Sequence, residues 1–418
     1  MRAAAATVLA ALVLTSCGGP SDEPATSTKT PTPAAASTRA AEANPHEGMS
    51  KRVLDRRLIA AAWKNDVRKA RLLIAAGADV NAKDKSEQSA YLISTSEGYL
   101  DLLELTLDNG ADVDSLDKWN GTGLIRAAER GHHHIVGRLL QTDIDVDHVN
   151  NLGWVALHEA IVLGDGSSRY VHTVRALVAG GADLTVAPKR DGISPVSHAR
   201  QRGFDRIATT IDGALEANRM TKSEANAALL RAADSGDADA AAIALREGAD
   251  IEARDANRRT PLLLAATGDH AAVARLFVDL DADPDALDDR HDSAWLVTGV
   301  SGSVRMAKIV ESAKPDFGLL NRFGGTSLIP ASERAHDDYV AWVVEHTPVK
   351  IDHVNELGWT ALLEAVILGE GTKRWQRVVR TLLDAGADAS IADKDGVTPL
   401  QHARKRGHTV IVRTLESG

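Results

Sequence analysis

Two stretches of the chain bring carboxylate and imidazole side chains close together in sequence. Such groups can bind a metal ion or exchange protons with a substrate. The first stretch contains Asp147, His148, His158 and Glu159, and the second contains Asp352, His353 and Glu364. Leu363 stands in the second stretch where His158 stands in the first, so the two stretches share one histidine position. We therefore expect neither a metal ion nor a catalytic residue here.

Three consecutive histidines, His132–His134, are a second candidate for metal binding. Adjacent residues of a helix do not face one another, so three in a row cannot all ligate one ion. We interpret them as structural or surface residues.

Two glycine-containing segments could bind an anion. They read GDGSSRYVH from Gly164 and GEGTKRWQR from Gly369. Paired glycines, a hydroxyl group and arginine can hold a phosphate or a carboxylate. The glycine spacing fits neither a Walker loop nor a dinucleotide fingerprint, so we expect no cofactor and favour a lengthened turn between helices. If a small anionic ligand does bind, the candidate residues are Arg169, Tyr170, Arg374 and Trp375.

These features lie within two copies of a longer sequence. The segment DHVNNLGWVALHEAIVLGDG from Asp147 matches DHVNELGWTALLEAVILGEG from Asp352, 205 positions later. Tyr91 and Trp295 correspond in the same way, 204 positions apart. One additional unit, ANAALLRAADSGDADAAAIALREGADIEARD, separates the copies. The repetition therefore indicates a duplicated structural element and not two independent active sites.

A shorter period runs through both copies. Each unit contains two short stretches whose apolar residues recur at helical spacing, such as Ile135-Val136 and Leu139-Leu140. One such helix pair cannot bury its apolar stripe alone, so the neighbouring unit must cover it. The period of 33 residues is marked by an acidic or amide residue at Asp84, Asp117, Asn150, Asp255, Asp288 and Asn321. A fixed period of this size predicts a solenoid.

The units resemble ankyrin repeats. The resemblance is clearest in KDGVTPLQHARKRGHTVIVRTL (Lys394–Leu415) and NRRTPLLLAATGDHAAVARLFV (Asn257–Val278), and it extends over eleven units. It implies an all-α solenoid of helix-turn-helix units with β-turn fingers, about eleven repeats in two duplicated arrays. It also implies a scaffold without enzymatic activity that binds proteins through its concave groove and fingers.

Three side chains are candidates for protein binding. Trp154 and Trp359 each follow a finger glycine, where ankyrin repeats commonly present a side chain to the groove, and Arg259 holds the equivalent place in another unit. Tryptophan and arginine are enriched among the residues that dominate binding energy. The alternative is that each tryptophan packs on its neighbouring finger.

The first residues resemble a bacterial lipoprotein signal. Arg2 precedes an apolar run from Ala3 to Leu14, and LTSC ends at Cys17. The run is too short to span a bilayer as a helix. The resemblance implies cleavage before Cys17, a lipid on that residue, and an extracytoplasmic protein anchored to the cell membrane. The alternative is an ordinary secretory signal. Since Cys17 is the only cysteine, disulfides and cysteine-ligated zinc are excluded.

Composition and segment boundaries complete the expectations. A net charge of −10 argues against a nucleic-acid partner, which requires a basic surface. We expect a signal peptide over 1–16, a lipidated cysteine with a disordered Ala/Pro/Ser/Thr-rich tether over 17–50, arrays over 51–213 and 225–418, and a connector over 214–224. The partner is then a cell-envelope protein of unknown identity, and the oligomeric state stays open. A small-ligand receptor and an enzyme using the Asp-His-Glu cluster remain the alternative functions.

Overall fold

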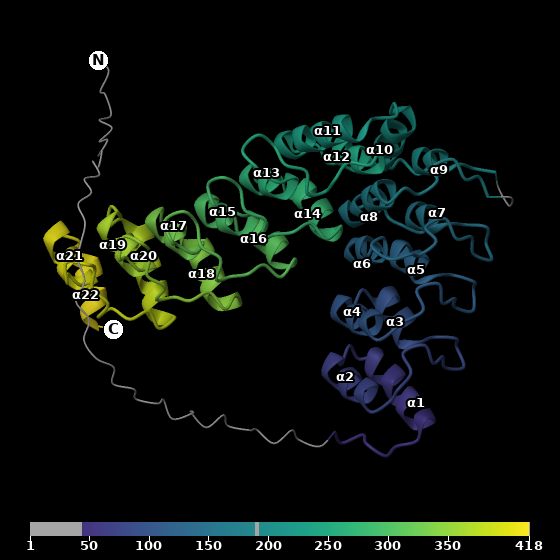
Figure 1. The fold of residues 1–418 in the computed structure, drawn as a ribbon, viewed down its shortest axis with the longest axis horizontal. Helices are drawn as coiled ribbons and strands as arrows, with labels where there is room; N and C mark the ends of the chain where they lie inside the picture. The colour runs from purple at the N-terminus through teal and green to yellow at the C-terminus, as the bar shows by residue number, and fades with distance from the viewer. Residues whose placement is uncertain (1–43, 189–191, 418) are drawn as a thin grey trace, which may run out of the picture. The chain divides into compact units, whose positions relative to one another are not determined.

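The computed structural model describes residues 44–188 and 192–417, and the regular structure in these residues is helical throughout (Figure 1). Its twenty-two helices form eleven consecutive pairs, which confirms the predicted solenoid. None of these helices combines the length and apolar character that a membrane span requires. The signal sequence with Cys17 lies outside the described residues.

Each pair consists of a first helix, a short turn and a second helix, and a finger loop leads to the next pair. The first helices are α1 (Lys51–Ala62), α3 (Ala90–Glu97), α5 (Gly123–Glu129), α7 (Ala156–Val162), α9 (Pro195–Gln201), α11 (Lys222–Ser235), α13 (Pro261–Thr267), α15 (Ala294–Ser301), α17 (Leu328–Glu333), α19 (Ala361–Ile367) and α21 (Pro399–Arg406). The second helices are α2 (Val67–Ala75), α4 (Leu100–Asp108), α6 (His133–Leu139), α8 (Ser168–Ala179), α10 (Asp205–Glu216), α12 (Ala238–Arg246), α14 (Ala271–Asp279), α16 (Val304–Glu311), α18 (Asp337–His346), α20 (Lys373–Asp384) and α22 (Thr409–Ser417). We call α1–α10 the first array and α11–α22 the second array.

Local sequence signals set the ends of the helices. Thr398 caps α21, because its hydroxyl accepts from the backbone of Gln401 while the Gln401 side chain accepts from the backbone of Thr398. Second helices end at glycines such as Gly77 (φ +100°) and Gly386 (φ +93°), in a backbone conformation that other residues rarely adopt. These turns direct the chain into the next finger.

The 33-residue period marks the base of each finger. Asp117 Oδ1 accepts hydrogen bonds from the backbone N–H groups of Trp119 (2.8 Å) and Gly121 (2.9 Å). Asn355 Oδ1 accepts in the same way from Leu357 and Trp359, each at 3.0 Å. Aspartate and asparagine are the side chains whose oxygen reaches the backbone two to four residues ahead. We call these the finger-base residues.

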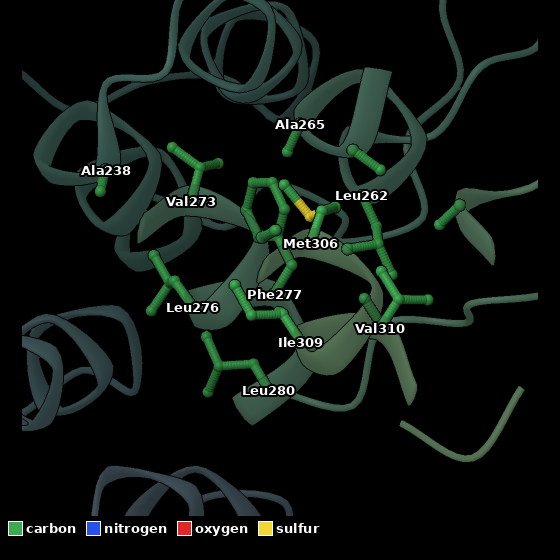
Figure 2. Close-up of a cluster of buried hydrophobic side chains, with 14 of the residues drawn as sticks. Ala238, Leu262, Ala265, Val273, Leu276, Phe277, Leu280, Met306, Ile309 and Val310 are labelled. Atoms are coloured by element: carbon green, nitrogen blue, oxygen red, sulfur yellow. The ribbon is translucent and has the colours of Figure 1, made fainter. Parts of the chain in front are cut away.

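The core runs between neighbouring pairs. Figure 2 shows one section, in which Phe277 of α14 is surrounded by apolar side chains that include Leu262 of α13 and Met306 and Val310 of α16. All four are fully buried. As predicted, each pair thus buries its apolar stripe against the next pair.

The two arrays also contact each other through second helices that are not consecutive, which the repeat pattern did not predict. Helix α12 packs across α8, and α14 packs against both α6 and α8, as Figure 1 shows. Helix α12 belongs to the additional unit that separates the two copies. Its buried face is made of alanines, which allow close approach between helices: Ala238, Ala241, Ala242 and Ala244. We call this contact the array joint.

Buried polar groups fix the array joint. Asp239 of α12 accepts from Arg175 Nε of α8 (2.7 Å) and from the Thr210 hydroxyl of α10 (2.6 Å). Nδ1 of His133 on α6 lies 2.6 Å from Asp279 Oδ2 at the end of α14. The Arg175 side chain is 7% exposed, so its charge depends on Asp239 for compensation.

A substitution at Gly137 of α6 tests how much the array joint contributes to stability. A Cβ at this position would lie 2.0 Å from the backbone oxygen of Asp279, so α6 and α14 could not keep their present distance. We expect Gly137→Ala to lower the free energy of unfolding by about 1–3 kcal/mol, as overpacking does elsewhere. Urea unfolding monitored by circular dichroism measures this change.

Gly213→Ala of α10 is the matched control. A Cβ there meets nothing closer than the flexible tip of Ile243 at 3.2 Å, so this variant should keep the parent's unfolding midpoint or raise it slightly. Equal midpoints for both variants would show that the α6–α14 contact contributes little to stability.

Candidate functional site

The residues of the Asp-His-Glu cluster serve different structural contacts. Asp147 and Asp352 accept from the backbone N–H of Asp183 and Asp388, each at 2.9 Å. His148 Nε2 lies 2.9 Å from the backbone oxygen of Asn120, and His353 Nε2 lies 2.6 Å from the backbone oxygen of Gly324. Each pair therefore ties one finger to another. The residues that the structure describes contain no group of three side chains placed to hold a metal ion.

The two glutamates of the cluster are buried beneath the fingers. Glu159 accepts from the finger-base residue Asn150 (2.5 Å), and Glu364 accepts from Asn355 (2.9 Å). Burial raises the pKa of each carboxyl group to about 7. His158 is likewise buried and meets the His198 ring edge-on at 5.9 Å. These contacts link finger to helix and leave no open acid–base pair.

The three adjacent histidines point to three different partners. His132 Nε2 lies 3.1 Å from the Ser96 oxygen, and His134 Nε2 lies 3.2 Å from the Gly98 oxygen. His133 reaches Asp279 in the array joint. Their roles are therefore structural, in agreement with the sequence interpretation.

The inserted segments lengthen the second helix as well as the turn. Helices α8 and α20 have 12 residues, against 7 to 10 in the other second helices apart from α10, which also has 12. Tyr170 is buried, and its hydroxyl donates to the backbone oxygen of Glu129 (3.0 Å). Trp375 Nε1 donates to the backbone oxygen of Glu333 (3.1 Å). Both aromatic residues thus pack on the end of the preceding first helix.

The arginines of these segments are paired with carboxylates. Arg169 lies 3.3 Å from Asp165, and Arg374 and Arg377 both reach Asp337, at 3.2 and 2.5 Å. These three arginines are therefore already paired, which does not favour their use in an anion site. The small-ligand hypothesis gains no support from this geometry.

The predicted protein-binding residues are only partly accessible. Trp154 and Trp359 are half-buried, and the Trp154 indole nitrogen is buried without a hydrogen-bond partner. Arg259 is also half-buried and pairs with its own finger-base residue Asp255 at 2.7 Å. Their role in binding stays a prediction.

More exposed apolar residues lie beside them, and these were not predicted from the sequence. They stand at finger tips and at the ends of first helices, which together we call the finger face. The exposed fractions are 55% for Trp119 and 51% for Phe323, 38% for Leu152 and 51% for Leu357, and 49% for Leu163 and 46% for Leu368. The members of each pair occupy equivalent positions in the two arrays. The available signal was an apolar residue one or two positions before a glycine, either in a finger or at the end of a first helix.

Each array has a cavity on its finger face at the equivalent place. The cavity of the first array measures about 340 Å³ and includes Trp119, and that of the second measures about 630 Å³ and includes Phe323. A cation lies over each aromatic ring: Lys118 is 5.3 Å from the Trp119 centroid and Arg322 is 4.5 Å from the Phe323 centroid. The duplicated element is therefore an exposed aromatic ring beside a cation at the mouth of a groove.

The buried glutamates predict a pH-dependent stability. Because the folded pKa of about 7 exceeds the ordinary value of 4.5, the folded state retains protons that the unfolded state has lost between these values. The resulting stability is complete below pH 4.5 and is lost as pH rises through 7. Glu159→Gln, a neutral replacement that keeps the acceptor for Asn150, should therefore stabilise the protein at pH 8 by about 1–3 kcal/mol.

Urea unfolding at pH 5 and pH 8 measures this effect, and the pH 5 comparison is the control, because Glu159 and its glutamine replacement are both neutral in the folded protein at that pH. Glu364→Gln should behave in the same way. An identical difference from the parent at both pH values would contradict the assignment of buried, protonated carboxyl groups.

Comparison with known proteins identifies the repeats. A family model described as ankyrin repeats (3 copies) matches residues 91–188, and one for a single ankyrin repeat matches residues 257–289. The ankyrin repeat protein YahD of Escherichia coli K12 is 35% identical over 186 residues, which cover 44% of this chain and 92% of YahD.

Two solved structures are also similar. An ankyrin repeat domain from Acinetobacter baumannii AYE is 40% identical and covers 45% of this chain and 96% of its own, with a TM-score of 0.44. A second ankyrin repeat protein is 34% identical and covers 46% of this chain and 97% of its own, also with a TM-score of 0.44. On the helix pairs, the finger geometry and the match to YahD, the chain belongs to the ankyrin repeat proteins.

Proposed function

We propose that this chain is a scaffold without enzymatic activity that binds a protein partner through its finger face. The observation that carries the proposal is the recurrence of exposed apolar side chains at equivalent positions of the two arrays, led by Trp119 and Phe323. Large apolar groups clustered at the surface of a soluble protein typically mark an interaction site. Aromatic anchors in a groove are also the side chains that contribute most to binding.

The contacts of the duplicated Asp-His-Glu cluster do not favour a catalytic role for it. The histidines and acids of the duplicated cluster are engaged with backbone groups or with one another. The relatives are also described as ankyrin repeat proteins, without a named reaction. A rigid stack of repeats presents a long recognition surface, which suits a scaffold.

The double variant Trp119→Ser/Phe323→Ser tests the finger face. Affinity capture from native envelope extract, with the full chain as bait, should recover a partner with the parent and lose most of it with the variant. Both residues are more than half exposed, so the variant should keep the parent's thermal midpoint.

Leu215→Ser is the matched control, because Leu215 is 44% exposed on α10, away from the finger face. Undiminished capture by the double variant would refute the finger-face assignment. Trp154→Ala/Trp359→Ala in the same assay would separate the half-buried tryptophans from the exposed aromatic residues.

We also propose that the chain is a lipoprotein held at the cell membrane outside the cytoplasm. The proposal is supported by the apolar run that ends in LTSC at Cys17. In the natural host, Cys17→Ser should abolish incorporation of radiolabelled palmitate and move the chain from the membrane fraction to the soluble fraction. Unchanged labelling and fractionation would refute lipidation at this residue.

A further inference from the structure

Several repeats tie the finger to the first helix through one pair of side chains. The finger-base residue contacts the residue nine positions further along the chain. The pairs are Asp117–Arg126 (2.5 Å), Asn150–Glu159 (2.5 Å), Asn355–Glu364 (2.9 Å) and Asp393–His402 (2.7 Å). In the repeat that begins at Asn321, the residue nine positions further along is Pro330, which cannot complete such a pair.

A cavity of about 200 Å³ lies at this repeat, between α17 and α19 on the finger face. Its apolar lining includes Ile329, Leu357 and Leu368. Two carboxyl groups also line it: Glu364, which is 5% exposed, and Glu333, whose side chain is 36% exposed. An apolar cavity with carboxylates suits a side chain that has an apolar stem and a cationic end.

The first array shows what occupies the equivalent position. There Arg126 replaces Pro330, and its guanidinium group is held by Asp117 Oδ2 (2.5 Å) and Glu129 Oε2 (2.7 Å). A Cβ on Gly121 would lie 3.0 Å from Arg126 Nη2, so the guanidinium group lies directly against this glycine. The Arg126 side chain is 15% exposed.

The surroundings of this position are retained in the second array. The equivalent pairs are Gly121 and Gly325, Ile125 and Ile329, Glu129 and Glu333, Leu152 and Leu357, Glu159 and Glu364, and Leu163 and Leu368. In contrast, Pro330 stands in the second array where Arg126 stands in the first, and Asn321 stands where the acceptor Asp117 stands. The second array thus keeps most of an arginine-binding environment without the arginine.

We propose that the cavity between α17 and α19 binds an arginine side chain of the partner protein, in the place that Arg126 holds in the first array. This inference rests on the proposed function of the finger face. The guanidinium group would donate to the carboxylates of Glu364 and Glu333, and its stem would lie along Leu357 and Leu368. Charge-assisted hydrogen bonds of this kind are stronger than neutral ones.

The charged groups around the cavity are compatible with this ligand. Glu333 now pairs with Arg334 at 2.7 Å, but both side chains are partly exposed, and such surface pairs contribute little. Burial is the main cause that raises the pKa of Glu364 to about 7, and the negative charge of Glu333 also raises it. The hydrogen bond from Asn355 and the positive charge of Arg334 lower this pKa. A bound guanidinium group favours the ionised carboxylate, so binding should strengthen as pH rises.

Saturation-transfer-difference NMR with N-acetyl-L-arginine amide and the full chain tests the proposal. N-acetyl-L-citrulline amide is the matched control ligand, because its side chain has the same shape without the charge. We expect the arginine derivative to bind about tenfold more tightly than the citrulline derivative at pH 8. Its Kd should rise about tenfold from pH 8 to pH 6, as a carboxyl group with a pKa of about 7 requires.

Two variants should act in opposite directions. Pro330→Arg supplies the missing side chain and should abolish binding, with the fold checked by circular dichroism. Arg126→Ala vacates the equivalent place in the first array and should add a second site. Glu364→Gln, which keeps the acceptor for Asn355, should remove the pH dependence.

Equal binding of the two derivatives, or unchanged binding to Pro330→Arg, would overturn the proposal. These results are separable from the test of the finger face. If Trp119→Ser/Phe323→Ser loses the envelope partner while the arginine derivative shows no preference, the arginine site is wrong and the proposed function stands.

Discussion

A helix pair of this length cannot bury its apolar stripe by itself, and the rest of the structure follows from that constraint. Each pair covers the stripe of the pair before it, so the core continues from one repeat to the next. The fingers can then be short, because the finger-base residue closes each of them through backbone hydrogen bonds. The surface left for recognition consists of the finger tips and the ends of the first helices.

The array joint modifies this simple stacking. Helices α6 and α8 of the first array are covered by α12 and α14 of the second array. The alanines of α12 permit the close approach, and the pair Arg175–Asp239 compensates the charges that it buries. The finger faces do not contribute to this joint, so both copies of the exposed aromatic residue stay accessible.

The fold could be predicted from sequence largely because repetition multiplies weak signals. One asparagine or aspartate says little, but Asp84, Asp117 and Asn150 at a constant spacing indicate one repeated turn. The array joint could not be predicted in this way, since Arg175 and Asp239 belong to no common period. The exposure of Trp119 and Phe323 likewise depends on where each finger tip ends in space. In the inserted segments, a turn was expected, whereas Ser167 and Thr372 start α8 and α20 early.

The additional repeat has a consequence for which repeats could be deleted from the protein. A plain duplication of five repeats would lengthen one stack, and any repeat could then be removed at the cost of one unit of length. Helix α12 instead packs against α8 and so connects the second copy to the first. Deleting α11 and α12 would remove the carboxylate that pairs with Arg175 and the helix that covers α8, and would change the connection that places α14 beside Gly137. This repeat therefore helps to join the two arrays, although it has no counterpart in the first array.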